Sequence, residues 1–154
     1  MKIEITEFRD IKFGEPSTKV RPLNTTPDGI LWCDKKEEQK IGLVLVSQIM
    51  YGFYKGKFMT GRVKFGSLEV YEIFLRALTE KYGTPNEVKS MSGVAKGWKL
   101  GDASIILYLD PLAQVNEGSL IYNYDPLIDE YTSETTNKKK EEIKMKVHAA
   151  KFDL

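Results

Sequence analysis

The stretch from Gly42 to Gly83 constrains the fold most, because it predicts two β-strands, a tight turn and a helix in direct succession. Runs rich in β-branched and aromatic residues cover 43–53 and 57–65, and Tyr54-Lys55-Gly56 separates them. A glycine that can adopt a left-handed conformation is typical of such a turn. We therefore predict a β-hairpin over 43–65.

The register of this hairpin depends on its turn. A two-residue loop at Lys55-Gly56 would mix apolar and charged side chains on one face, which could not be buried cleanly. A three-residue loop ending in a Gly56 bulge leaves one apolar face, so we predict this register. The apolar face then carries Leu45, Ile49, Tyr51, Phe53, Met59, Val63 and Phe65. The outward face carries Phe58, Thr60, Arg62 and Lys64.

A helix should follow the hairpin at once. Ser67 can cap its N-terminus, Gly83 can end it, and Pro85 prevents its continuation. We predict a helix from Ser67 to Tyr82 that packs on the hairpin, because its apolar residues recur at helical spacing. These residues are Tyr71, Phe74, Leu75, Leu78 and Tyr82.

The remaining chain has shorter β-like runs and one short element near Ser17, either a helical turn or a capped turn. The β-like runs cover 1–8, 30–33, parts of 87–100, 104–110 and 119–124. With the hairpin they predict a single α+β domain over 1–130, built on an antiparallel sheet of about five or six strands.

Residues 131–154 are predicted to form a C-terminal helical tail. The Ser- and Thr-rich part over 131–137 is a poor helix former, whereas 138–152 is a good one. One narrow apolar face holds Ile143, Val147 and Ala150, flanked by Met145, Ala149 and Phe152. Two alternatives stay open: the tail packs on its own domain, or it contacts a partner such as a second subunit.

Composition excludes several classes of function. With 23 basic and 22 acidic residues the formal net charge is +1, so no global field attracts nucleic acid or anionic membranes. The longest apolar run, 41–46, is too short to cross a bilayer. The single cysteine and the absence of an apolar leader favour a cytoplasmic location. An exported domain whose leader has been removed is the alternative.

Catalytic chemistry has little support in the sequence. Cys33 and His148 are the only residues of their types, too few for a zinc or iron site, and Cys33 lies in an apolar run. Helix capping accounts for the acidic residues around Asp125. The glycine-containing segment Gly93 to Lys99 lacks the spacing of a phosphate-binding loop. We therefore predict a protein that is not an enzyme and holds no cofactor or metal.

The predicted binding surface is the outward side of the hairpin. Aromatic and basic side chains together can stack bases and hold phosphates. The residues are Lys55, Lys57, Phe58, Thr60, Arg62 and Lys64. The alternative is a merely solvated sheet face. We predict a non-catalytic protein-binding or assembly module, whose partner is another protein or, in a homo-oligomer, a second copy of the chain. Single-stranded nucleic-acid binding is the alternative function.

Several dispersed motifs resemble a group of uncharacterised small bacterial α+β proteins. They are the pattern Phe8, Ile11, Phe13-Gly14, Ser17 and Val20, then Tyr51 to Phe58, Tyr71, Leu78, Trp98 and Ile121-Tyr122. The helix followed by Tyr82-Gly83-Thr84-Pro85 is remotely similar to envelope lipoproteins of the outer-membrane-assembly type. The resemblance implies an α+β fold and assigns no functional residue. The lipid-bearing cysteine of those lipoproteins has no counterpart here.

Overall fold

The fold is α+β, as predicted, and is built on a larger antiparallel sheet than expected. The structure is a computed structural model that describes residues 3–89, 94–110 and 117–154. Its main sheet has eight strands in the order β3-β4-β7-β8-β12-β11-β10-β9, and two further sheets are the hairpins β1–β2 and β5–β6. The strands are β1 Glu7–Phe8, β2 Ile11–Lys12, β3 Arg21–Thr25, β4 Ile30–Asp34, β5 Lys40–Ile41, β6 Val44–Leu45, β7 Gln48–Tyr54, β8 Lys57–Phe65, β9 Asn86–Lys89, β10 Val94–Leu100, β11 Ala103–Leu109 and β12 Gly118–Tyr124.

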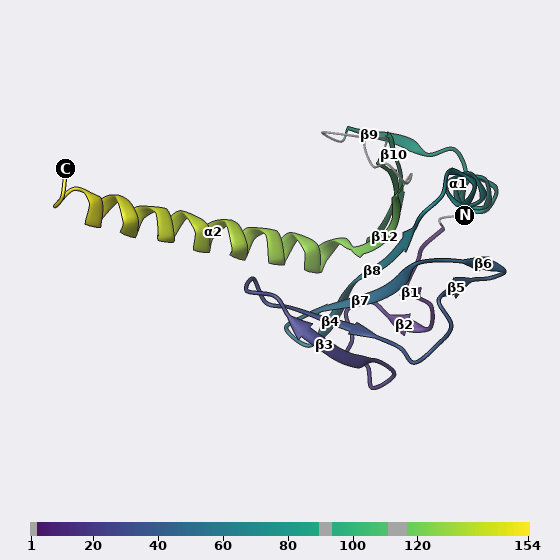
Figure 1. Cartoon of the computed structure of the whole chain (residues 1–154), viewed down its shortest axis with the longest axis horizontal. Coiled ribbons are helices and arrows are strands. Elements are labelled where there is room, and N and C mark those ends of the chain that lie inside the picture. Colours follow the sequence, from purple (N-terminus) through teal and green to yellow (C-terminus); the bar gives the residue numbers. More distant parts are fainter. Residues whose placement is uncertain (1–2, 90–93, 111–116) are drawn as a thin grey trace.

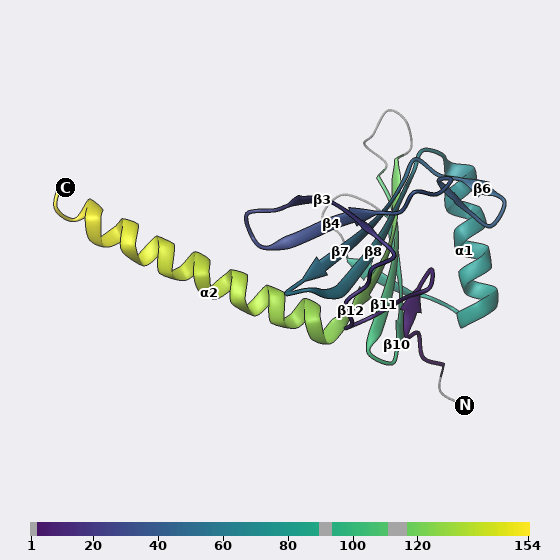
Figure 2. The ribbon, with the colours of Figure 1, turned by 90° about the horizontal axis from the view of Figure 1, so that it is seen from below.

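The two helices relate to the sheet in different ways. Helix α1, Leu68–Tyr82, packs along one face of the sheet, whereas helix α2, Asp125–Ala150, leaves the end of β12 and projects away from the body (Figures 1 and 2). The main core lies between the sheet, α1 and the N-terminal β1–β2 hairpin. It includes Phe8, Tyr51, Phe58, Phe74 and Ile105.

The predicted helix is confirmed together with both of its caps. The hydroxyl of Ser67 accepts a hydrogen bond from the backbone N–H of Val70 at 3.1 Å, and Gly83 ends the helix with a φ of 95°. The left-handed conformation at this end suits glycine. Tyr71, Phe74 and Leu78 are buried. Local signals therefore place α1 correctly, because its caps and apolar spacing agree.

The register predicted for the β7–β8 hairpin was wrong at its turn. Tyr54 pairs with Lys57 across a two-residue turn, and the register shift lies between Gly52 and Phe53, with Gly52 paired to Thr60 and Phe53 to Phe58. This bulge, rather than one at Gly56, restores an apolar face farther along the strands. Phe58 consequently points into the core instead of outward.

The strand pattern also differs before the hairpin. The strand predicted over 43–53 divides into β6 and β7. Strand β6 pairs with β5 in a separate small hairpin, in which Gly42 has a φ of 59°, and β7 begins only at Gln48. The predicted strand over 1–8 is reduced, within the described residues, to β1. Near Ser17, the side-chain hydroxyl accepts a hydrogen bond from the N–H of Lys19 at 3.1 Å, so a capped turn leads into β3.

Helix α2 is continuous across the Ser- and Thr-rich segment that was predicted to be a poor helix former. Packing supports its first turns, because Leu127 is buried against Ile30, Tyr54 and Met59. Tertiary contacts of this kind commonly override weak intrinsic propensity. The helix begins at Asp125 and ends at Ala150, so it starts before the predicted tail helix over 138–152 and stops two residues short of its predicted end.

Candidate functional site

The structure divides the six predicted hairpin residues into exposed and buried groups. Lys55, Lys57, Arg62 and Lys64 are exposed. Phe58 and Thr60 are fully buried, so their predicted outward position was wrong. Phe58 stacks on Phe13 with ring centroids 4.9 Å apart, and the Thr60 hydroxyl hydrogen bonds to the Asn123 side-chain oxygen at 2.7 Å. The bulge beside Gly52 moves Phe58 to the core face, whereas Thr60 keeps the same side as Arg62 and is buried there next to Gly52 and the Trp32 ring.

A different aromatic residue accompanies the basic side chains on the face opposite α1. The guanidinium of Arg62 lies 5.0 Å from the centre of the Trp32 ring, which suits a cation–π contact. Trp32 covers Gly52, where a Cβ atom would come within 3.0 Å of the indole. A shallow pocket of about 190 Å³ lies here. Its lining residues are Asn24, Trp32, Gln48, Met50, Arg62 and Lys64.

Lys55, which was predicted to belong to the binding surface, contacts helix α2 instead. Its ammonium donates hydrogen bonds to the carboxylates of Glu130 at 3.0 Å and Glu134 at 2.6 Å, both on α2. The Tyr54 hydroxyl also donates to Glu134. These hydrogen bonds lower the pKa of Glu134, with Lys55 the largest cause. The hairpin turn is therefore a docking point for the base of α2.

Further contacts complete this docking. The Tyr54 and Tyr131 rings meet edge to face with centroids 5.3 Å apart, and the Tyr131 hydroxyl donates to the Asp28 carboxylate in the loop before β4. At the start of α2, the Ser104 hydroxyl donates to Asp125 at 2.6 Å, and Lys99 forms an ion pair with the same carboxylate. The helix thus leaves the body in a direction that several elements determine.

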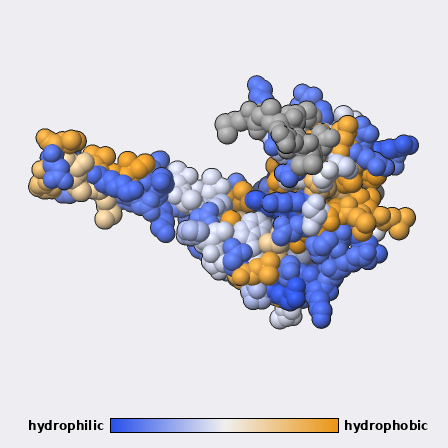
Figure 3. All heavy atoms as spheres, in the orientation of Figure 1, coloured by the Kyte–Doolittle hydropathy of each residue, from blue (hydrophilic) through white to orange (hydrophobic). Residues whose placement is uncertain are grey.

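The distal arm, defined here as residues 136–154, has no residue classed as even partly buried. The predicted tail residues Ile143, Val147 and Ala150 all lie on it. Ile143 and Val147 are each 51% exposed, and Met145 and Phe152 are more exposed still. Figure 3 shows hydrophobic residues among the charged ones toward the end of the arm. Within the described chain, the arm does not pack on its own domain.

The arm carries apolar residues on two opposite sides. Ile143, Val147 and Ala150 follow one another at spacings of four and three, and so do Met145, Ala149 and Phe152. Because each residue of an α-helix turns by roughly 100°, an offset of two residues places the second row on the far side of the helix. The second row therefore does not flank the first. A helix with this arrangement is suited to burial on both sides.

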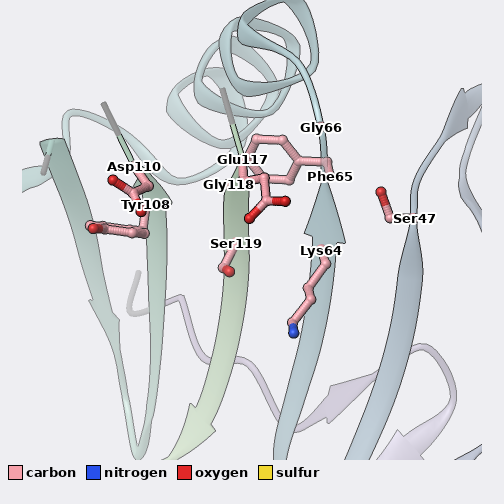
Figure 4. Close-up of a pocket in the computed structure, with 9 residues that line it drawn as sticks. All are labelled: Ser47, Lys64, Phe65, Gly66, Tyr108, Asp110, Glu117, Gly118 and Ser119. Carbon is pink, nitrogen blue, oxygen red and sulfur yellow. The ribbon is translucent and has the colours of Figure 1, made fainter. Parts of the chain in front are cut away.

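The sequence did not predict a second pocket, larger than the one beside Trp32, at the end of β8 farthest from the hairpin turn. Figure 4 shows this pocket of about 450 Å³, in which Lys64 lies with two serine hydroxyls and the carboxylates of Asp110 and Glu117. The lining comes from the starts and ends of β8, β11 and β12, so their approach follows from strand pairing rather than from any sequence motif. Its residues are Ser47, Lys64, Phe65, Gly66, Tyr108, Asp110, Glu117, Gly118 and Ser119.

A second unforeseen cluster surrounds the Tyr51 hydroxyl, which donates to Glu37 at 3.0 Å and accepts from Arg9 at 3.3 Å. Arg9 also bonds Glu37 at 3.1 Å. Burial is the largest cause that raises the pKa of Tyr51. The cluster ties the β1–β2 turn to the loop before β5. Since each group has a partner within the cluster, its evident role is structural.

The described ranges contain neither a metal-binding cluster nor a helix able to cross a membrane. In residues 3–89, 94–110 and 117–154, no group of three or more His, Cys, Asp or Glu side chains is placed to hold a metal ion. No helix in the same ranges has both the length and the apolar character needed to cross a bilayer. The predicted phosphate-loop candidate at 93–99 begins outside the described residues, and its remainder is part of β10.

Comparisons with known proteins found no match among family models, curated proteins or solved structures. The resemblance to small bacterial α+β proteins and envelope lipoproteins stays a prediction. The functional argument therefore depends on the geometry of this chain alone.

Proposed function

We propose that the protein is a non-catalytic protein-binding or assembly module whose binding element is the distal arm. The observation that carries the proposal is an exposed helical arm with large apolar side chains, held at its base by the body. Exposed apolar residues grouped on one element are characteristic of interaction sites. Recognition of an apolar helix face by a partner is a common mode of protein binding.

The stability of an isolated helix supports the need for a partner. Helices shorter than about 12–15 residues are marginal in water when nothing packs on them. The helical part of the arm, 136–150, is of that length, and the junction at Thr135, Thr136 and Asn137 consists of weak helix formers. Burial of Ile143 and Val147 by a partner would supply stabilisation that the arm lacks in the free chain.

The docked base supports the same proposal. Leu127 and Tyr131 pack on the body, and Lys55 binds two carboxylates of the next turns. These contacts present the arm in a defined direction, which lowers the conformational entropy lost when a partner binds.

Site-specific photocrosslinking in cells of the source organism tests this function. A photoreactive residue replaces Val147 on the arm, and a matched control replaces exposed Thr25 on β3. We expect a discrete protein adduct from position 147 and none from position 25. If position 147 gives no adduct under conditions that preserve native complexes, the arm is not a binding element and the proposal fails.

Single-stranded nucleic-acid binding is the second candidate function, now centred on a different set of side chains. The favouring observation is the exposed pair Arg62 and Lys64 beside the half-buried Trp32 ring. Phosphates could bind the two cations, and bases stack on aromatic rings in proteins of this kind.

A salt titration tests this second candidate with single-stranded RNA as the probe. Replacement of both Arg62 and Lys64 by Ala should weaken binding and reduce the salt slope by about one for each phosphate contact removed. Lys36→Ala, at another exposed lysine, is the control. Binding that does not weaken as salt rises would exclude this function, because phosphate contacts are sensitive to salt.

A further inference from the structure

The distal arm points away from the end of the molecule that carries the exposed apolar side chains of α1 and the β5–β6 hairpin. Figure 1 places the arm on one side of the body, and α1 with the β5–β6 hairpin on the other. Figures 1 and 2 agree that this hairpin lies beside α1. The arm of one molecule is therefore directed away from its own α1–hairpin surface.

The α1–hairpin surface, defined by Leu43, Leu45, Leu68 and Ile73, is exposed to solvent. Leu43 is 101% exposed and Leu45 is 70% exposed, whereas Leu68 and Ile73 are each more than two-fifths exposed. Figure 3 shows hydrophobic residues gathered over this side of the body. Two leucines at the tip of a small hairpin contribute little to their own fold, so their apolar character is explained better by a contact with another molecule.

The charges of the distal arm and of helix α1 also favour contact between them. The arm contains six lysines and three acidic residues, whereas the remainder of the chain contains 17 basic and 19 acidic residues. Exposed Glu69 and Glu72 lie on α1 next to Leu68 and Ile73, whereas Glu80 already forms an ion pair with Arg76 of the same helix. Contact between two arms would bring lysine-rich segments together, which is unfavourable, whereas contact between an arm and α1 joins opposite charges.

We propose that the distal arm of one copy packs on the α1–hairpin surface of a second copy of this chain. This inference rests on the proposed function and names the partner. The row of Ile143 and Val147 would meet Leu43, Leu45 and Ile73, and arm lysines would lie near Glu69 and Glu72 of α1. The two surfaces differ, so the contact closes into a dimer only when both copies exchange arms, and otherwise continues into a chain of copies.

Mixing two variants of the full-length chain tests the pairing directly. The arm variant carries Ile143→Asp and Val147→Asp, and the surface variant carries Leu43→Asp and Leu45→Asp. All four sites are exposed, so circular dichroism should show that both variants remain folded. Each charge placed in an apolar contact should weaken association by about tenfold or more. Leu23→Asp, on the edge strand β3, is the matched control.

Sedimentation velocity then gives the result. The parent chain and the Leu23 control should associate, and each double variant alone should sediment as a monomer of 17.6 kDa. An equal mixture of the two variants should recover association, because one intact arm still meets one intact surface. A monomeric parent at every concentration, or a mixture that stays monomeric, overturns the inference.

Failure here is distinguishable from failure of the proposed function. An adduct from position 147 with twice the mass of 17.6 kDa supports a second copy as the partner. An adduct with another protein retains the arm as a binding element and overturns the self-pairing. The absence of any adduct overturns both.

Discussion

The two helices have the same secondary structure but opposite relations to the rest of the molecule. Helix α1 is capped at both ends and buries Tyr71, Phe74 and Leu78, whereas α2 is longer, lacks a side-chain cap and buries only Leu127. Length is therefore not a measure of what a helix contributes to the fold. The short helix forms part of the core, and most of the long one is available to a partner.

The largest expected difference in unfolding free energy is between a substitution on the core face of α1 and one on the arm. Phe74→Ala should lower the free energy of unfolding by about 3–5 kcal/mol, because it removes a buried ring. Ile143→Ala, as the exposed counterpart, should change it by less than about 0.5 kcal/mol in the monomer. Urea unfolding followed by circular dichroism measures both. Equal losses would show that the arm is part of the folded core.

Within α2, truncation of an apolar side chain should destabilise the protein more at the base than on the arm. Leu127→Ala should cost about 2–3 kcal/mol, toward the lower end for a buried leucine, because its cluster lies at the edge of the body. Hydrogen exchange should show that residues 125–135 lose protection together in this variant, while α1 keeps its own. If protection of 125–135 is unchanged, the hydrophobic contact does not hold the base of α2.

Loss of a serine hydroxyl should lower the free energy of unfolding in α1 but not in α2, and this difference is smaller than the preceding ones. Ser67→Ala removes the side-chain acceptor of the Val70 N–H and should cost about 1 kcal/mol. Ser133→Ala, at an exposed site on α2, should be neutral or slightly stabilising, because alanine is the better helix former. Thermal unfolding of the two variants side by side checks this difference in sign.

The smallest expected effect is a pH dependence of the docked base. The folded protein lowers the pKa of Glu134 from 4.5, so its contacts with Lys55 and Tyr54 are fully present above about pH 4.5 and are lost as the pH falls through the lowered value. Amide NMR shifts of residues 128–135 should report this acid transition. Glu134→Gln should abolish it, and its persistence in that variant would assign the transition to another carboxylate.

Local patterns predicted those parts of the site that depend on neighbours in the chain. The caps of α1, the hairpin itself and the apolar residues of the tail are all readable from spacing. The position of Phe58 was not, because a bulge is a property of two paired strands and a shift of one residue reverses the side of every following residue. Trp32 was missed for the same reason, since pairing of β4 with β7 brings it above Gly52.

The sequence alone determined the α+β class, α1 with its ends, and an apolar helical tail, since each of these depends on interactions over a few residues. Only the tertiary structure decided that Lys55 docks α2, that Phe58 belongs to the core and that residues 136–154 stand clear of the body. Those outcomes depend on groups far apart in the chain, here 79 residues for Lys55 and Glu134. Periodicity reports which side of a helix is apolar, but only the packed body shows whether anything covers it.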